Sequence, residues 1–259
     1  MQQKQQEWYE QWFNFRDDNL FLFQEWIYPN TLNDFKGNEV LECGCGGGQH
    51  TLFIAPYAKE IVAVDLNTID IAKKWNSQFE NVTFVEDDIA EMNLKRQFDI
   101  VFSIGVVHHT NNPDKTVENL KRHVKPGGKL IVWVYSKEGN FIMEQIVEWF
   151  RKTFLRHISR WVLGKISIII TLVLYLPVYS IYMFPLKFLP YYEYFENFRR
   201  LSFHRNNLNV FDKLNAPQVE FIDKLRISRW FDEKEFEDIH ISAYKGVSWR
   251  GSGTKRCQG

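Results

Sequence analysis

The sequence predicts an α/β fold in which helices cover both faces of a mainly parallel β-sheet. Three observations support this fold class. Between residues 36 and 137, short apolar strands alternate with helical segments, the pattern of a sheet that is buried on both faces. A glycine-rich turn follows the first of these strands, and the next strand ends in an acidic residue, Asp65. In nucleotide-binding α/β folds, a carboxylate in that position accepts hydrogen bonds from ribose hydroxyls.

The core elements follow one another without a long break. Strands are expected at 40–42, 61–65, 82–85, 98–103 and 129–135. Helices are expected at 49–58, 67–78 and 114–124. The Lys-Pro-Gly-Gly sequence at 125–128 predicts a turn before the last of these strands.

The segments on either side of this core have different patterns. An aromatic-rich helix is expected over 5–28, where Pro29 ends it. Residues 141–160 form an amphipathic helical pattern, and the following 21 residues from Ile166 to Leu186 carry no charge. A helix is expected at 219–231, and two final strands at 236–242 and 243–249.

Composition narrows the class of protein. The chain has 259 residues with 32 Lys and Arg against 32 Asp and Glu, a balance that argues against a nucleic-acid partner. Its three cysteines make a poor disulfide framework and fit a reducing compartment. The first residues lack the apolar stretch of a secretory signal, so we expect a cytoplasmic protein.

Aromatic residues are concentrated in two places. Of 42 Phe, Tyr and Trp residues, nine lie in residues 1–28 and twelve in residues 161–203. The two segments flank the nucleotide-binding pattern. Rings there are typical of a wide apolar cleft, a bilayer interface, or both.

The glycine-rich turn over residues 42–48, Glu-Cys-Gly-Cys-Gly-Gly-Gly, does not fit the common phosphate-binding patterns. Gln49 stands where a dinucleotide-binding loop needs its third small residue, and the Gly-Lys-Ser/Thr ending of a phosphate loop is absent. Glu42 would repel a pyrophosphate. The turn instead favours a cationic amino acid attached to adenosine.

Five ordered stretches resemble the class I S-adenosylmethionine-dependent methyltransferases, within them the methyltransferase type 11 and ubiquinone-biosynthesis-like group. The turn at 42–48 resembles motif I, although Glu42 replaces the commoner Asp. Asp65 matches the ribose-binding acid, and 84–89 matches the adenine-binding segment, with Asp87 in the usual Gly place. Residues 98–110 resemble motif IV, and 124–132 resemble the segment before the fifth strand.

The resemblance implies a Rossmann-like, seven-stranded sheet with one antiparallel strand and the cofactor S-adenosyl-L-methionine. It also implies a set of cofactor-binding residues. The ribose would meet Asp65, the adenine would meet Asp88 and Ile89, and Ser103 would face the methionine end. The strand end and turn would contribute Glu42, Gly44, Gly46 and Gly48.

His108 and His109 are the candidate catalytic residues. They follow the fourth strand at the open carboxyl edge, where ligands sit in such sheets. A base is needed only when the methyl acceptor is a hydroxyl or a protonated amine. The alternative is that one histidine caps the following helix or contacts the cofactor. His109 is the favoured base because it lies nearer the loop.

Two further features have both a functional and a structural interpretation. Cys43 and Cys45 could form half of a metal site, but small residues also fit a crowded strand end, and we expect no metal. The aromatic residues of the N-terminal helix are more often packing residues than catalytic ones, but the resemblance implies a leading helix that closes over the cofactor, where Tyr9 or Trp12 would touch it.

The uncharged segment 166–186 is long enough to span a bilayer. Pro177 divides it, leaving a first arm of 11 residues that reaches about 16 Å. Two arms fit a helical hairpin dipped into one leaflet or a soluble cap over the active site. A cationic run precedes the segment and would suit anionic lipid headgroups: Arg151, Lys152, Arg156, Arg160 and Lys165.

The sequence therefore predicts an enzyme in four parts. These are a helical lid (1–35), the cofactor-binding core (36–137), a helical, very hydrophobic insertion (138–228) and C-terminal strands that complete the sheet (229–259). We expect methyl transfer to a small hydrophobic or lipid-linked acceptor, such as a quinone precursor or lipid-linked sugar. Residues 141–190 would then contact the inner face of the membrane.

Three alternatives remain open at this point. One is a methyltransferase of a soluble sugar or metabolite. The second is a non-catalytic, membrane-attached protein that binds S-adenosylmethionine as a regulator or assembly partner. The third is a nicotinamide-dependent oxidoreductase.

Overall fold

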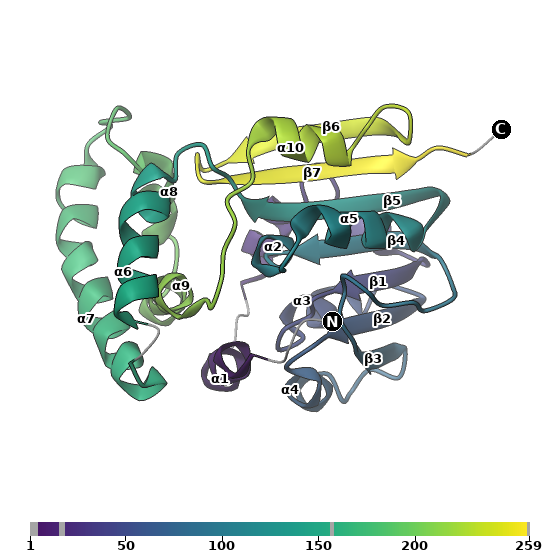
Figure 1. Cartoon of the computed structure of the whole chain (residues 1–259), viewed down its shortest axis with the longest axis horizontal. Helices are drawn as coiled ribbons and strands as arrows, with labels where there is room; N and C mark the ends of the chain where they lie inside the picture. Colours follow the sequence, from purple (N-terminus) through teal and green to yellow (C-terminus); the bar gives the residue numbers. More distant parts are fainter. Residues whose placement is uncertain (1–4, 16–18, 156–157, 258–259) are drawn as a thin grey trace.

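The computed structural model describes residues 5–15, 19–155 and 158–257. A seven-stranded sheet with the order β3-β2-β1-β4-β5-β7-β6 forms its centre (Figure 1). Its strands are β1 (Glu39–Cys43), β2 (Glu60–Asp65), β3 (Val82–Glu86), β4 (Phe98–Ile104), β5 (Val124–Tyr135), β6 (Phe236–Tyr244) and β7 (Ser248–Lys255). Strands β1 to β5 pair in parallel, and β7 is antiparallel to both β5 and β6. The predicted Rossmann-like sheet with one antiparallel strand is confirmed.

The central strands β1, β2, β4 and β5 are buried on both faces because apolar residues occupy consecutive positions. Val40 and Leu41 of β1 point to opposite faces, and each joins a different apolar cluster. One cluster packs α2 (Leu20–Ile27) and α3 (Gln49–Ile54) on the sheet, and α4 (Ile69–Trp75) joins them. The other packs α5 (Pro113–Arg122) and α10 (Lys224–Trp230) on the opposite face. This two-sided burial holds the carboxyl edge of the sheet, where the site lies, in a fixed geometry.

A helical cap lies beside that carboxyl edge. Its elements are a π-helical turn (Met143–Val147), α6 (Glu148–Thr153), α7 (Arg160–Val178), the turn η5 (Ile181–Met183), α8 (Tyr192–Phe198) and α9 (Phe203–Asn215). Figure 1 shows these helices gathered on the side toward which β4 and β5 point. A third apolar cluster joins α7, α8 and α9, with Leu163, Phe198 and Phe211 among its members.

The N-terminal segment forms two helices in the described residues, so the prediction of one helix over 5–28 is wrong. The first is α1 (Gln6–Asn14), which ends where Phe15 has an extended backbone. The second is α2, which begins after Asn19 and precedes Pro29. A 3-10 turn, η1 (Leu32–Phe35), then leads into β1.

Two predicted elements near the C-terminus are also wrong in extent. Of the helix expected at 219–231, only Lys224–Trp230 is helical, because the N–H of Ile222 donates to the carbonyl of Tyr135 and Asp223 caps α10. The final hairpin turns at Lys245 and Gly246, both with positive φ, rather than near residue 242. The last strand is therefore Ser248–Lys255, and the boundary drawn at 228/229 falls inside α10.

Two smaller differences from the predicted elements occur next to proline and glycine residues. The helix at 49–58 ends at Ile54, two residues before Pro56. The predicted turn at 125–128 is a bulge inside β5, because Val124 pairs with Phe98 and Lys129 with Ile100.

Pro177 does not divide the hydrophobic segment into two helical arms. It lies in the last turn of α7, a continuous helix of 19 residues. At about 1.5 Å per residue the helix is about 28 Å long, rather than 16 Å. The segment after it turns through Ile181–Met183 instead of forming a second arm, which corrects the expected hairpin. Arg156 of the cationic run lies outside the described residues.

Candidate active site

The glycine-rich turn forms the floor of a pocket at the carboxyl end of β1. Gly44 and Gly46 have φ values of +82° and +54°, which side-chain-bearing residues rarely adopt. A Cβ on Gly44 would lie 2.5 Å from Val106, and one on Gly46 would lie 2.9 Å from the indole of Trp12. Both positions therefore require glycine, and both line the pocket.

Asp65 fixes the turn from the neighbouring strand. Its carboxylate accepts the N–H of Gly46 at 3.0 Å and the N–H of Asn67 at 2.7 Å. The hydroxyl of Thr68 donates to the same group at 3.0 Å. Burial raises the pKa of Asp65, while these hydrogen bonds favour its charged form.

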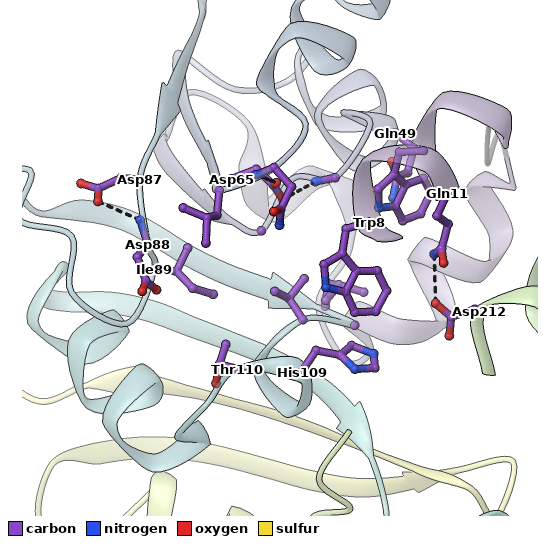
Figure 2. A pocket seen from close by; sticks show the side chains of 18 residues that line it. Trp8, Gln11, Gln49, Asp65, Asp87, Asp88, Ile89, His109, Thr110 and Asp212 are labelled. Atoms are coloured by element: carbon purple, nitrogen blue, oxygen red, sulfur yellow. Dashed lines mark hydrogen bonds between the residues drawn. The ribbon is translucent and has the colours of Figure 1, made fainter. Parts of the chain in front are cut away.

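The pocket is acidic. Four aspartates line it, and no Lys or Arg is among its described lining residues. They are Asp65, Asp87, Asp88 and Asp212. Figure 2 shows them around one space, with Ile89 beside Asp88. Carboxylates suit a ligand that carries hydroxyl, amino and cationic groups, whereas a pyrophosphate would be repelled. This donor set fits S-adenosylmethionine and argues against a dinucleotide.

Helix α1 covers this pocket. Trp8, Gln11 and Trp12 line it, whereas the predicted Tyr9 points elsewhere and donates to Asp70 at 3.0 Å. The open space beneath α1 is about 110 Å³. The indoles of Trp8 and Trp12 narrow this space.

Three residues predicted to bind the cofactor do not line the pocket. Ser103 is fully buried and donates to the carbonyl of Cys43 at 2.8 Å, whereas the neighbouring Ile104 lines the pocket. Gly48 packs against α4, where a Cβ would meet Asn76 at 2.3 Å. These two residues shape the turn from behind.

Glu42 is the third of these residues. Its side chain is buried behind the turn and accepts the hydroxyl of Thr51 at 2.5 Å. His50 lies 3.8 Å from its other oxygen. Burial raises the pKa of Glu42 to about 8, and the charge of Asp65 adds to the effect.

His109 lies between two spaces. Its ring lines the acidic pocket and also a larger cavity beneath the cap. Its Nδ1 lies 2.7 Å from the carbonyl oxygen of Gln218, which makes Nδ1 the protonated nitrogen and leaves Nε2 as the acceptor. Burial lowers the pKa of His109, although the nearby Asp212 partly opposes this. Trp8 packs on the ring, with centroids 4.7 Å apart (Figure 2).

His108 lies in a different environment. It is fully buried, it lines neither space, and neither ring nitrogen has a hydrogen-bond partner among the described residues. Its ring packs on Tyr135 with centroids 4.2 Å apart. Burial lowers the pKa of His108 well below its ordinary value, so the ring is a neutral core group.

The cavity beneath the cap is large and mostly apolar. Its volume is about 500 Å³, and its walls come from α2, β5, α7, α8, α9 and the segment 214–221. Aromatic side chains predominate on the walls, among them Trp26, Trp133, Tyr135, Tyr194 and Phe198. The cavity meets the acidic pocket at His109 and Asp212.

Sequence reasoning missed Asp212. This residue of α9 accepts Gln11 of α1 at 3.0 Å and the hydroxyl of Tyr135 at 2.9 Å. It therefore joins the lid, the cap and the sheet at the junction of the two spaces. No local motif marks it, because its position depends on how α9 packs.

The cysteines of the turn are buried and free. Burial raises the pKa values of the Cys43 and Cys45 thiols well above the ordinary value. Among the residues that the structure describes, no group of three or more His, Cys, Asp or Glu side chains is arranged to hold a metal ion.

Comparisons with known proteins identify a domain in the core of the chain. Residues 41–132 match the family model of a methyltransferase domain. The ubiquinone biosynthesis O-methyltransferase of Rickettsia conorii is 26% identical over 134 residues, 48% of this chain and 46% of that protein. The tRNA U34 carboxymethyltransferase of Idiomarina loihiensis is also 26% identical, over 47% of this chain and 42% of that protein. The chain thus spans about half the length of the curated relatives it matches.

Solved structures extend the likeness to the whole fold. The N-methyltransferase NodS of Bradyrhizobium japonicum, solved with S-adenosyl-L-homocysteine, has a TM-score of 0.50 at 10% identity. The match covers 96% of this chain and 98% of NodS. The carbon methyltransferase of CurJ gives 0.50 at 12% identity over 86% of this chain and 50% of that chain. Residues 41–132 thus form a methyltransferase domain, and the chain as a whole has the fold of the class I S-adenosylmethionine-dependent methyltransferases.

Proposed function

We propose that the protein transfers a methyl group from S-adenosylmethionine to a small, hydrophobic or lipid-linked acceptor. The carrying observation is the position of His109, whose ring lines both the acidic pocket and the apolar cavity. When bound, the cofactor supplies a methyl group on a positively charged sulfur. The acidic pocket suits that charge, and the apolar cavity suits an acceptor that leaves water.

The cofactor would be held by Gly44, Gly46, Asp65, Asp88 and Ile89. Replacing Asp65 with Asn removes the charge and one of the two oxygens that accept the N–H groups of Gly46 and Asn67, and keeps the other oxygen. Because hydrogen bonds to a charged group are worth about 1.5–3 kcal/mol, we expect roughly tenfold or greater loss of affinity in calorimetry. Asp232→Asn, at an exposed site, is the control. Equal affinities would remove Asp65 from the ribose site.

His109 would act as the base. The carbonyl of Gln218 holds Nδ1–H, so Nε2 can accept the proton of an acceptor hydroxyl or ammonium group. S-adenosylmethionine, when bound, would supply the methyl carbon to the acceptor atom and keep the electron pair of the broken carbon–sulfur bond on its sulfur. Asp212 lies where it stabilises the positive charge on the protonated ring, since its charge raises the pKa of His109. His108, the other histidine predicted, has no such access.

A label-transfer experiment tests the acceptor class. The purified protein is incubated with methyl-labelled S-adenosylmethionine and with either the lipid extract or the aqueous extract of the same cells. We expect label in the lipid phase, and loss of that label when Val219→Trp fills the cavity, which Val219 lines. Label confined to the aqueous phase would favour a soluble sugar or metabolite. Absence of S-adenosylhomocysteine with either extract would favour a non-catalytic binding protein.

The outer surface of the cap supports a membrane-bound acceptor. In α6 the apolar Trp149 and Phe150 are exposed, whereas Glu148 and Arg151 are buried. The pattern continues along α7 and the following turns, where Trp161, Leu176 and Phe188 are 74%, 73% and 81% exposed. An exposed apolar surface of this extent is typical of a membrane or protein contact.

Length and composition alone do not decide how α7 meets a bilayer. Among the described residues, α7 is the one helix that is both long enough and apolar enough to cross a membrane. A buried core helix passes the same test, but only 22% of this window is buried. One face of α7, with Leu163, Ser167 and Thr171, packs inward. We therefore infer that the protein is cytoplasmic and rests its cap on the inner face of the membrane, with α7 lying in the interface.

Vesicle flotation tests this placement. Leu172 and Leu176 are exposed on α7, so replacing both with Asp should abolish flotation with lipid vesicles. Leu225→Asp is the matched control, because Leu225 is 63% exposed on α10, outside the cap. Equal flotation of the three proteins, or none with the unaltered chain, would contradict membrane contact.

A further inference from the structure

Lys213 of α9 places a positive charge inside the apolar cavity. Its ammonium nitrogen lies 5.5 Å from the ring centroid of Tyr135 and 5.1 Å from that of Tyr194. Among the described residues it has no ion pair or hydrogen bond. Tyr135 also packs on His109, with ring centroids 5.9 Å apart, so Lys213 and the candidate base contact the same ring and line the same cavity.

The other charges of the cavity walls do not cancel it. The walls carry four cationic side chains and two carboxylates. Both oxygens of Glu148 are engaged by Arg151, at 2.6 and 2.7 Å. Those of Asp212 are taken by Gln11 and Tyr135. The cavity therefore has a net positive charge, and neither of its two lysines, Lys213 and Lys245, has an ion pair with a carboxylate in the described residues.

A cation in an apolar space needs a partner when water is excluded. Desolvation of an ammonium group costs several kcal/mol, and the faces of two tyrosine rings offset only part of that cost. A ligand that fills the cavity displaces the water around Lys213. An anionic oxygen on the ligand would restore what that water supplied.

We propose that Lys213 binds an anionic oxygen of the acceptor, so that the acceptor is an amphiphile with an apolar body and an acidic group. A carboxylate and a phenolate both carry such an oxygen. The proximity of Lys213 to His109 places the acidic group beside the atom that receives the methyl group. The inference rests on the proposed function, in which this cavity holds the acceptor.

Three probes with the same ten-carbon tail test the proposal by direct binding. Decanoate, decanol and decylammonium carry charges of −1, 0 and +1 at pH 7.5. Each is titrated into the full chain with S-adenosylhomocysteine present, below its micelle-forming concentration, and binding is measured by calorimetry. We expect decanoate to bind about tenfold tighter than decanol, with decylammonium weakest.

Variants locate the effect. Lys213→Gln should reduce the preference for decanoate over decanol to less than twofold, and Lys213→Arg should restore it. Lys74→Gln, at an exposed lysine of α4, should keep it. Val219→Trp should abolish binding of all three probes, which separates the cavity from the exposed apolar surface of the cap. A decanoate preference that is absent, or that survives in Lys213→Gln, would overturn the proposal.

The experiment also separates this inference from the proposed function. Lys213 does not line the acidic pocket, so Lys213→Gln should bind S-adenosylhomocysteine as the unaltered chain does. Loss of the decanoate preference with intact cofactor binding supports the role of Lys213. Failure of the unaltered chain to bind S-adenosylhomocysteine would instead contradict the cofactor assignment.

Discussion

Two carboxylates at neighbouring strand ends have different environments and different roles. Asp65 lines the acidic pocket and receives several hydrogen-bond donors. Glu42 is buried behind the turn with Thr51 as its hydrogen-bond donor and His50 nearby. The sequence motif treats both as cofactor-binding residues. The structure distinguishes them, because Asp65 lines the pocket whereas Glu42 is buried behind the turn.

Glu42 makes the stability of the ligand-free protein depend on pH. Its pKa is about 8 in the folded chain and 4.5 ordinarily, so the folded state keeps a proton that the unfolded chain releases. The contribution of Glu42 to the free energy of unfolding is therefore complete below pH 4.5 and is lost as the pH rises toward 8. Glu42→Gln, which mimics the protonated group, should lose this slope.

Thermal unfolding from pH 5 to pH 8 measures this effect. We expect the free energy of unfolding of Glu42→Gln to rise relative to that of the unaltered chain as the pH increases. The change should be on the order of a few kcal/mol at pH 8. Glu80→Gln, at an exposed site, is the control. Parallel stability curves for the Glu42 variant and the unaltered chain would show that the carboxyl is charged in the folded state.

His109 should control the acid limb of the pH–rate profile. Because burial lowers its pKa from the ordinary 6.5, the neutral ring persists to lower pH, and kcat/KM should fall only below pH 6.5. His109→Asn keeps a donor for Gln218 but removes Nε2, so kcat should fall about 10²- to 10⁴-fold with unchanged cofactor affinity. His108→Asn should retain the acid limb. A limb that persists in His109→Asn would assign the base elsewhere.

The sequence predicts best the site residues whose positions depend on the local course of the backbone. Gly44, Gly46 and Asp65 lie within one strand, its turn and the end of the next strand, so their spacing carries the geometry. Ser103 follows the same logic, but strand alternation turns its hydroxyl toward Cys43. Asp212 has no such local signal, because it reaches the site through the packing of α9 on α1 and the sheet.

At the scale of elements, α1 acts as the lid of the acidic pocket. Its indoles Trp8 and Trp12 line the pocket, and Gln11 links it to Asp212 of the cap. The sequence predicts a covering helix here, and Trp12 as one contact. It does not identify Trp8, which packs on His109.

Trp12→Ala should open the lid. The indole stands over Gly46, so its removal widens the entrance and removes a contact to the bound cofactor. We expect S-adenosylhomocysteine to dissociate about tenfold faster in stopped-flow measurements, since a truncated indole loses a few kcal/mol of contact at most. Phe13→Ala, on the same helix but 67% exposed, should have little effect. Equal rates in both variants would show that α1 does not gate the pocket.

The elements outside the core are predicted less well, for physical reasons. Pro177 lies in the last turn of α7, where few helical hydrogen bonds remain after it, so the proline destabilises the helix little. For this reason α7 does not end at Pro177, where the sequence pattern suggested. The segment 219–223 has a helical pattern, yet backbone bonds to Tyr135 and His108 hold it extended. Long-range pairing decides both the extended segment and the register of the final hairpin.

At the scale of the whole molecule, charge is distributed unevenly. The chain has no net charge, yet residues 141–190 contain six Lys and Arg against two Asp and Glu. The rest of the chain is therefore negative. An anionic membrane would attract the cap and repel the remainder, which orients the exposed apolar surface and the cavity toward the lipid.

This asymmetry predicts salt-dependent binding to anionic vesicles. Lys152, Lys165 and Lys187 are exposed on the cap. Each is worth about 1 kcal/mol near an anionic surface. Replacing all three with Gln should weaken binding to vesicles that contain phosphatidylglycerol by roughly tenfold or more in a sedimentation assay.

Raising the salt from about 0.1 M to 1 M, which shortens the screening length from about 10 Å to 3 Å, should have a similar effect. Lys36, Lys74 and Lys234, exposed outside the cap, provide the matched triple control. Equal binding to anionic and neutral vesicles would show that apolar contact alone holds the cap, and the orienting role of charge would be wrong.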